Sequence, residues 1–530
     1  MLFNSFDFLL FIFIFGGFYY CFPKRNIQNL ILLIFSYIFY GFWDVRFLFL
    51  IVLSTYVDFF CGLIMKRSLI SKFNRCLYSL FLIICAILFV EVSWKDFEPN
   101  FNLIWYGLTS SILAVIFLNC IYQLSVSYKI KKPEKMGVTI SVIVNLTILG
   151  FFKYFNFFVS SFSEMVNSFG IESNVELLNI VLPVGISFYT FQTMSYSLDI
   201  KKGSLSPTRS YLDFSVFVSF FPQLVAGPIE RAQVFLPQVF KSRDFDLNAL
   251  KRGLFLICLG FFKKVAIADP ISRLVDPGFI LGQSYNTLDV YLSTLFFTIQ
   301  IYGDFSGYSD IARGLAKVFG FNLMVNFRRP YFSKVPSEFW RRWHISLSSW
   351  LRDYLYIPLG GNKFTSIKTY RNLFLTMLIG GLWHGASWNF VLWGAYQGLI
   401  LVVYRLLNIV PSKSKVSQVF FHIVFFHLTM FGWLLFRANS FKLISQNISA
   451  FFNFEGINTL ISRPGLPLLV SIIIIIIYEF FVEFKLYEKL KTPKRVILKE
   501  VAVGGFIGVL IFLALVGNLK PPAPFIYFQF

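Results

Sequence analysis

Charge and histidine are scarce in this chain of 530 residues. Only 14% of the residues are charged and 56% are hydrophobic, whereas a soluble domain has about 25% charged and about 45 to 50% apolar residues. This composition excludes an ordinary soluble domain. Apolar runs recur from end to end, each long enough for the roughly 20 helical residues that cross a bilayer. We therefore predict an all-α polytopic membrane protein with roughly a dozen spans.

Cysteine is also rare, and no C-x-x-C pair occurs. We expect the six cysteines to be small buried hydrophobic residues rather than disulfides or metal ligands; they are Cys21, Cys61, Cys76, Cys85, Cys120 and Cys258. The sequence also lacks a phosphate-cradling glycine loop and a G-x-S-x-G nucleophile elbow. The amino terminus has no basic segment before its apolar run, so we predict a retained first span rather than a signal peptide.

Acidic residues are outnumbered, 27 against 48 lysines and arginines, which gives a net charge of +21. The basic residues gather in short loops between apolar runs, as the positive-inside rule requires, so no nucleic-acid partner is expected. The loops at 24–25, 66–75, 129–135, 201–202 and 485–499 are predicted to be cytoplasmic. With a last span at 501–516, both termini are then extracytoplasmic.

We predict one membrane domain with an uneven organisation. Clean spans occupy 1–200, a site-bearing core 210–440, further spans 441–518 and an extracytoplasmic tail 519–530. Between 210 and 372, half-length apolar segments alternate with proline, glycine and charge. Irregular backbone at membrane depth is tolerated only where protein buries it or where it lines a wet cavity. This region is therefore the predicted site-forming core.

His344 lies in the sequence FWRRWHISLS at 339–348. Helical spacing of four residues would place Trp340, His344 and Ser348 on one face. Imidazole titrates near physiological pH, so a histidine in apolar surroundings suggests proton transfer. The alternative is an interfacial helix anchored by tryptophan and arginine, in which His344 is merely hydrogen-bonded.

His384 follows Trp383, with a glycine pair before it and a glycine after it. Glycines allow close backbone approach by a ligand or by a neighbouring helix. A satisfied core histidine remains the alternative. His422 and His427 have no polar neighbours of note in the sequence, and we predict structural roles for both.

The segment at 300–310 carries two carboxylates and several hydroxyls in an apolar context. Carboxylates at membrane depth are costly unless paired. We expect Asp304 and Asp310 to meet arginines such as Arg313, or to accept hydrogen bonds from serine and tyrosine. Without a companion cluster at ligand spacing, no metal site is predicted.

Several of these segments together resemble the membrane-bound O-acyltransferase family. The resemblance covers most of the chain and rests on Trp343-His344, Trp383-His384-Gly385, LPVGISFYTFQ at 182–192, FPQLVAGPI at 221–229, DFSGYSD at 304–310 and WLRDYLYIPLGGNK at 350–363. The branch that it resembles most is that of bacterial alginate and peptidoglycan O-acetyltransferases. The teichoic acid D-alanyl transfer proteins are more distant relatives.

The resemblance implies about 11 to 13 transmembrane helices with re-entrant segments around a tunnel. His384 matches the catalytic histidine and His344 the second family histidine. We expect His384 to take the proton of a hydroxyl that attacks a thioester, while Trp343, Arg342 or His344 stabilises the oxyanion. The expected substrate-binding residues are Trp343, Arg342, Trp383, Asp304, Ser306 and Asp310.

The chain ends on PPAPFIYFQF at 521–530. An apolar chain end is unusual, because termini are ordinarily polar and frayed. It resembles the C-terminal tyrosine motif of this family's partners and tails, which implies that Tyr527 receives the acyl group. The alternative is an interfacial aromatic anchor.

The expected function is transfer of a short acyl group, acetyl, from a cytoplasmic thioester to a surface or secreted polysaccharide. The expected co-substrate is acetyl-CoA, with no permanently bound cofactor, and the location is the bacterial cytoplasmic membrane. Expected partners are an extracytoplasmic acetyltransferase or hydrolase-like protein, the polysaccharide acceptor and membrane lipid. Alternatives are D-alanyl or other acyl transfer to a cell-wall polymer, a scaffold subunit of a polysaccharide synthase, and a proton-coupled transporter, whose paired inverted repeats the sequence does not show.

Overall fold

Helices form all the regular secondary structure of the described residues, which contain no strand. The structure is a computed structural model, and it describes residues 3, 5–91, 101–172, 175, 177, 178, 180–454, 459, 461–485, 525 and 526. Within them, five segments are long and apolar enough to cross a membrane: Val45–Lys66, Gly107–Val126, Pro133–Ser168, Lys415–Arg437 and Leu466–Glu483. The all-α, polytopic fold predicted from the sequence is confirmed. The predicted last span at 501–516 lies outside the described residues.

The chain forms two compact units, which are described separately. Unit 1 comprises Met1–Leu247 with Phe319–Leu323, and unit 2 comprises Asn248–Val318 with Met324–Phe530. The helices of unit 1 are α1 (Phe6–Cys21), α2 (Arg25–Gly41), α3 (Leu48–Lys66), α4 (Lys72–Glu91), α5 (Phe101–Val126), α6 (Pro133–Leu149), α7 (Phe155–Ser168), α8 (Ile186–Lys202), α9 (Tyr211–Ser219), α10 (Phe221–Leu224) and α11 (Ala232–Val239). The four basic stretches expected between 24 and 202 fall at helix ends, and their cytoplasmic location stays a prediction.

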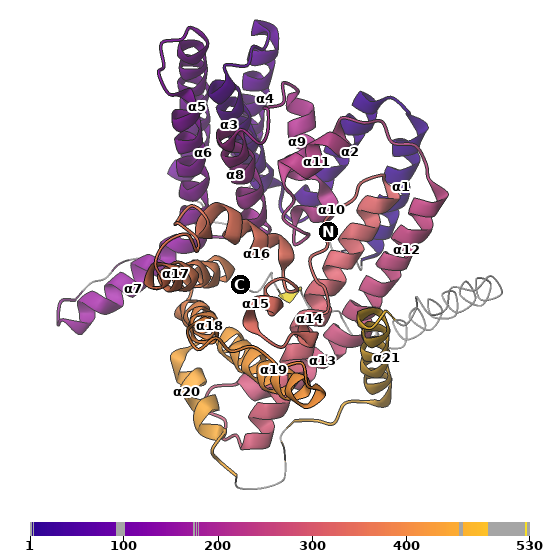
Figure 1. Ribbon diagram of the computed structural model, residues 1–530. Helices are drawn as coiled ribbons and strands as arrows, with labels where there is room; N and C mark the ends of the chain where they lie inside the picture. The colour runs from indigo at the N-terminus through magenta and orange to yellow at the C-terminus, as the bar shows by residue number, and fades with distance from the viewer. Residues whose placement is uncertain are drawn as a thin grey trace. The chain divides into compact units, whose positions relative to one another are not determined.

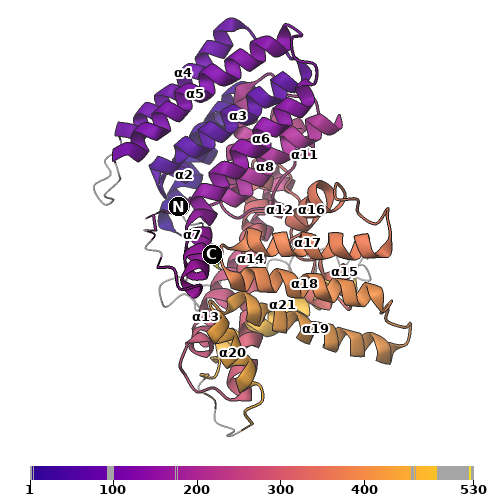
Figure 2. The same ribbon diagram turned by 90° about the vertical axis from the view of Figure 1, so that its left-hand side faces the viewer.

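Polar side chains join the helices at the centre of unit 1, where α3, α6 and α8 run side by side (Figures 1 and 2). The fully buried carboxylate of Asp58 on α3 accepts hydrogen bonds from Ser141 and from Asn145 Nδ2 at 2.7 Å, both on α6. It also accepts from Ser197 Oγ on α8 at 3.1 Å. Because a buried carboxylate is costly without donors, these bonds fix the three helices to one another.

The helices of unit 2 include three that lie side by side, α17, α18 and α19 (Figure 2). Within the described residues of this unit, the α-helices are α12 (Leu247–Phe261), α13 (Asp269–Val275), α14 (Thr287–Val318), α15 (Pro336–Phe339), α16 (Ile345–Leu351), α17 (Ser366–His384), α18 (Trp388–Leu406), α19 (Lys415–Arg437), α20 (Phe441–Ala450) and α21 (Leu466–Glu483). A π-helical segment, η3 (Phe262–Ala268), joins α12 to α13, and all three elements form one continuous run that packs on α14.

The prediction for 210–372 is partly wrong. Short helices and irregular backbone are present, as expected, but the region also contains α14, a continuous helix of 32 residues. Its polar side chains interrupt the apolar pattern in the sequence. They do not interrupt the helix, and its charged side chains Asp304, Asp310 and Arg313 are held there by ion pairs.

Glycine lies at the contact between α17 and α18. A Cβ atom added to Gly381 would lie 2.3 Å from the carbonyl oxygen of Phe390, and one added to Gly394 would lie 2.6 Å from that of Met377. Both distances are too short for any side chain larger than hydrogen. Gly381, which lies three residues before His384, therefore serves the approach of a neighbouring helix, one of the two alternatives open from the sequence.

The cysteine prediction is partly wrong as well. No disulfide joins the six cysteines, but of these only Cys61 is buried. Cys21, Cys76 and Cys120 lie on the exposed faces of their helices, because hydrophobic side chains at the surface of a membrane protein face lipid rather than a core.

We predict that Asp58→Ala destabilises unit 1. The variant leaves the buried donors of Ser141, Asn145 and Ser197 without their acceptor, at a cost of about 1 to 3 kcal/mol. The midpoint of thermal unfolding of the purified protein in detergent should fall. Asp244→Ala, which replaces an exposed carboxylate of the same unit, is the control. Equal midpoints for the two variants would contradict this role of Asp58.

We also expect Gly381→Ala to force α17 and α18 apart. The added methyl group meets backbone atoms that cannot rotate away, so overpacking should cost about 1 to 3 kcal/mol or more. Gly17→Ala is the matched control, since its Cβ would meet no atom within 4 Å. The measurement is the midpoint of thermal unfolding of both proteins. It should fall for Gly381→Ala and stay unchanged for Gly17→Ala.

Candidate active site around His384 and His344

His384 is the last residue of α17 and lies at the start of the short turn into α18. Its side chain is 5% exposed. The ring lies among aromatic residues in edge-to-face geometry, with centroid distances of 5.0 Å to Trp393, 5.1 Å to Trp383 and 5.4 Å to Phe436. This packing fixes the orientation of the imidazole. A freely rotating surface histidine would have no such contacts.

His384 also lines a cavity of about 200 Å³. By comparison, an engineered apolar cavity of about 150 Å³ is large enough to bind benzene. Most of the lining is apolar, and Ser348, Arg352, Tyr356 and Thr376 supply its polar side chains beside His384. The cavity therefore has room for a short acyl chain, with one imidazole in its wall.

His344 is fully buried, and its ring lies 6.4 Å from that of His384, centroid to centroid. Its Nδ1 donates to Asn326 Oδ1 at 3.2 Å, an oxygen that also accepts from Ser346 Oγ at 2.9 Å. Asn326 Nδ2 in turn donates to Ser309 Oγ at 3.3 Å, which fixes the orientation of the amide. The two histidines are thus brought together, as the resemblance implies.

The predicted helix through 340–348 is wrong. α15 ends at Phe339, and α16 begins only at Ile345. Between them, His344 has φ 41° and ψ 54°, a left-handed conformation that few residues other than glycine adopt. The backbone N–H of Ile345 donates to the carbonyl of Asn326 at 2.9 Å, so the segment that carries Asn326 holds the chain in this break.

His344 lies between two short helices, outside the five spanning segments. Burial lowers the pKa of His344 to about 3, because the charged imidazolium would lose its hydration. The ring is therefore neutral at physiological pH. It suits the role of a fixed hydrogen-bonding partner better than that of a proton carrier.

Arg342 and Trp343 lie outside the cavity lining. Trp343 is buried in an aromatic cluster, 4.7 Å from Trp433 and 5.0 Å from Phe327 between ring centroids. Arg342 donates to Glu338 and to Glu483, each at 2.8 Å. Both residues therefore support the loop that carries His344, and their predicted contact with substrate stays a prediction.

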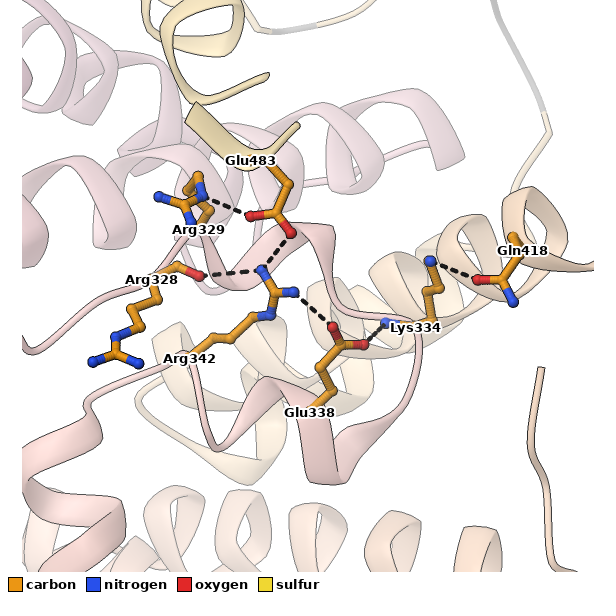
Figure 3. Close-up of polar contacts among 7 residues, drawn as sticks. All are labelled: Arg328, Arg329, Lys334, Glu338, Arg342, Gln418 and Glu483. Carbon is orange, nitrogen blue, oxygen red and sulfur yellow. Dashed lines mark hydrogen bonds and ion pairs between the residues drawn. The ribbon is translucent and has the colours of Figure 1, made fainter. Parts of the chain in front are cut away.

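The ion pairs of Arg342 belong to a larger chain of polar contacts (Figure 3). Glu483, at the end of α21, also accepts from Arg329 Nε at 2.6 Å. Glu338 also accepts from the backbone N–H of Lys334 at 3.0 Å, and Lys334 Nζ donates to Gln418 on α19 at 2.5 Å. The loop before His344 is thereby tied to α19 and α21.

Asp304 and Asp310 on α14 are ion-paired, as expected, but the predicted partners are only partly right. Asp310 meets Arg313 at 3.0 Å and also Lys263 at 2.9 Å. Asp304 meets Lys264 at 2.8 Å rather than an arginine. Ser306 is buried on the same helix. None of the three predicted substrate-binding residues of α14 is among the side chains that line the cavity.

The remaining predicted residues have diverse surroundings. Trp383 lies beside both histidines, with its ring centroid 5.9 Å from that of His344. His427 contacts Tyr291, Nε2 to OH at 3.2 Å, and His422 packs near Phe332, which agrees with structural roles.

Tyr527 lies outside the described residues. Within the described part of the chain, no group of three or more His, Cys, Asp or Glu side chains has the arrangement of a metal site.

Three residues that contact the histidines could not be identified from the sequence: Asn326, Trp393 and Phe436. Asn326 lies 18 residues before His344 in a segment without periodicity, so no local pattern marks it. Trp393 and Phe436 occupy positions in α18 and α19 that look like ordinary membrane helix. Only the helix packing shows that their rings surround His384.

The sequence is similar to those of several known proteins. Residues 91–435, which include both histidines, match the model of the membrane-bound O-acyltransferase family. The chain is 36% identical to the probable alginate O-acetylase AlgI of Pseudomonas putida over the full length of both proteins. It is 39% identical to the protein of that name from Pseudomonas aeruginosa, over 86% of this chain and 75% of the relative.

A third relative is the peptidoglycan O-acetyltransferase of Helicobacter pylori, 33% identical over 68% of this chain and 76% of the relative. The family match covers most of unit 2 and ends one residue before Phe436. It therefore includes the α17–α18 turn, the cavity and the loop of His344. The chain is an O-acyltransferase that belongs to the membrane-bound O-acyltransferase family.

Proposed function

We propose that this protein transfers an acetyl group from acetyl-CoA, bound from the cytoplasm, for O-acetylation of a cell-surface or secreted polysaccharide. The observation that carries the proposal is the position of His384, an imidazole held edge-on by aromatic rings in the wall of an otherwise mostly apolar cavity. Relatives named alginate O-acetylase and peptidoglycan O-acetyltransferase support acetyl as the group and a glycan polymer as the acceptor.

In the proposed reaction, His384 accepts the proton of an attacking hydroxyl as its oxygen adds to the thioester carbonyl. The tetrahedral intermediate collapses, the carbon–sulfur bond breaks, and the thiolate of CoA leaves with the proton from His384. The ester is the second product. His344, neutral and fixed by Asn326, serves in this scheme as the neighbour that orients the site rather than as a second base.

The attacking hydroxyl of this scheme is the phenol of Tyr527. An acyl-tyrosine then carries the acetyl group to the extracytoplasmic side, where a hydrolase-like acetyltransferase passes it to the polymer. Support comes from the apolar chain end and from the predicted topology, in which both termini are extracytoplasmic and the protein lies in the bacterial cytoplasmic membrane.

We expect His384→Ala to lower acetylation of the polymer by at least about 100-fold, the usual contribution of a general base. The measurement is the acetyl content of the polysaccharide from cells that carry only the variant. His427→Ala is the matched control, because His427 lies on α19 and contacts Tyr291 instead of the cavity. Full acetylation by the His384→Ala protein would refute the mechanism.

The acyl-carrier role predicts that Tyr527→Phe folds and binds the donor yet delivers no acetyl group outside. Removal of one hydroxyl leaves the ring in place and eliminates only the nucleophile. Incubation with radioactive acetyl-CoA should label the wild-type protein at Tyr527, and the variant should remain unlabelled there. Normal delivery by Tyr527→Phe would show that the residue is an interfacial anchor.

A further inference from the structure

The residues Phe525 and Ile526, near the end of the chain, are buried in unit 2. Their exposed fractions are 3% and 2%. Chain ends are ordinarily frayed unless specific contacts tie them down. Burial of these two residues therefore requires a contact that offsets the entropy lost on ordering them.

That contact is a carboxylate. The backbone N–H of Ile526 donates to Asp304 Oδ2 at 2.7 Å, and Lys264 Nζ lies 2.8 Å from the other oxygen of the same group. Lys264 also meets Asp269 at 2.8 Å. Asp304 is itself buried. A hydrogen bond to an ionised acceptor in a buried place is about twice as strong as a neutral one.

Aromatic packing continues from this contact towards the active site. The ring of Phe525 lies 4.9 Å from Tyr308 and 6.0 Å from Phe305, centroid to centroid. Phe305 is fully buried and meets His344 edge to face at 4.7 Å. A single aromatic ring, that of Phe305, therefore separates Phe525 from His344.

The neighbouring carboxylate on α14 provides a comparison. Asp310 is held by two cations, Lys263 and Arg313. Asp304 is paired with one lysine, which it shares with Asp269, and its second oxygen binds the backbone of Ile526. In the part of the chain that the structure describes, both carboxylates of α14 are thus ion-paired, and the backbone N–H of Ile526 bonds to Asp304 and not to Asp310.

We propose that Asp304, held by Lys264, is the anchoring site of the C-terminal segment and seats Phe525 against Phe305 beside His344. Because the bond is made by a main-chain N–H, it does not depend on the side chain at 526. Asp304 is then a positioning residue. The inference deepens the proposed function and rests on it in one respect: the residue that follows Ile526 is Tyr527, the proposed acyl acceptor.

The test measures access to residue 526 by the rate of maleimide labelling of Ile526→Cys, in full-length protein whose six native cysteines are replaced by alanine. Asp304→Ala should accelerate this labelling about tenfold or more, since loss of a charge-assisted bond favours local opening. Asp310→Ala is the matched control and should leave the rate unchanged. No acceleration with Asp304→Ala, or the same acceleration with both variants, would overturn the anchor.

A second pair of variants leaves α14 untouched. Ile526→Pro removes the N–H donor, whereas Ile526→Val keeps both the donor and an apolar side chain. With Phe525→Cys as the probe in the same cysteine-free protein, labelling should be about tenfold faster beside proline than beside valine. Equal rates would again overturn the proposal. Because proline changes only the chain end, misfolding of the core cannot produce the difference.

Delivery of acetyl groups outside the cell is the functional readout. Asp304→Ala and Ile526→Pro should lower this delivery. Ile526→Val, which keeps the N–H donor, should deliver as much as the wild-type protein. If the proposed function fails, so that His384→Ala retains full acetylation, the labelling rates still report on the anchor. If the anchor fails, the labelling rates are flat while the effect of His384→Ala persists.

Discussion

The close contact between the glycine faces of α17 and α18 is the constraint on which the site depends. No side chain separates the two helices at Gly381 and Gly394, so their backbones set the geometry directly. The chain therefore turns immediately after His384. Gly385 completes the turn, since a Cβ there would lie 2.1 Å from the ring of Phe390. The imidazole of His384 is placed by backbone packed against backbone, which leaves little freedom in its position.

Carboxylates bind many of the cations in unit 2. Lys263 and Lys264 pair with aspartates of α14, and Arg329 and Arg342 pair with Glu483 at the end of α21. A cation is expensive to bury without such a partner. These four basic residues therefore join parts of unit 2 to one another. The lining of the cavity is mostly apolar.

Helices with regular apolar runs and basic flanks could be predicted from the sequence, and α1 to α3 and the region of α17 to α19 illustrate this. The apolar run before His384 and the glycines around it were also visible in the sequence. The break at His344 was not, because its cause is Asn326, a residue without a local signal. Nor was the partner of Asp304, because Lys264 lies 40 residues earlier in η3 and meets α14 only in the folded bundle.

The chain of contacts in Figure 3 has a consequence for the order of folding. Arg342 lies next to Trp343, yet its partner Glu483 is 141 residues further along the chain. At about 5 to 20 residues per second, synthesis reaches Glu483 about 7 to 28 seconds after Arg342. Until then Arg329 and Arg342 lack their shared carboxylate. The ion pairs that tie the loop of His344 to α21 therefore form late, after α21 has been made. The surroundings of His344 are complete only at that stage of synthesis.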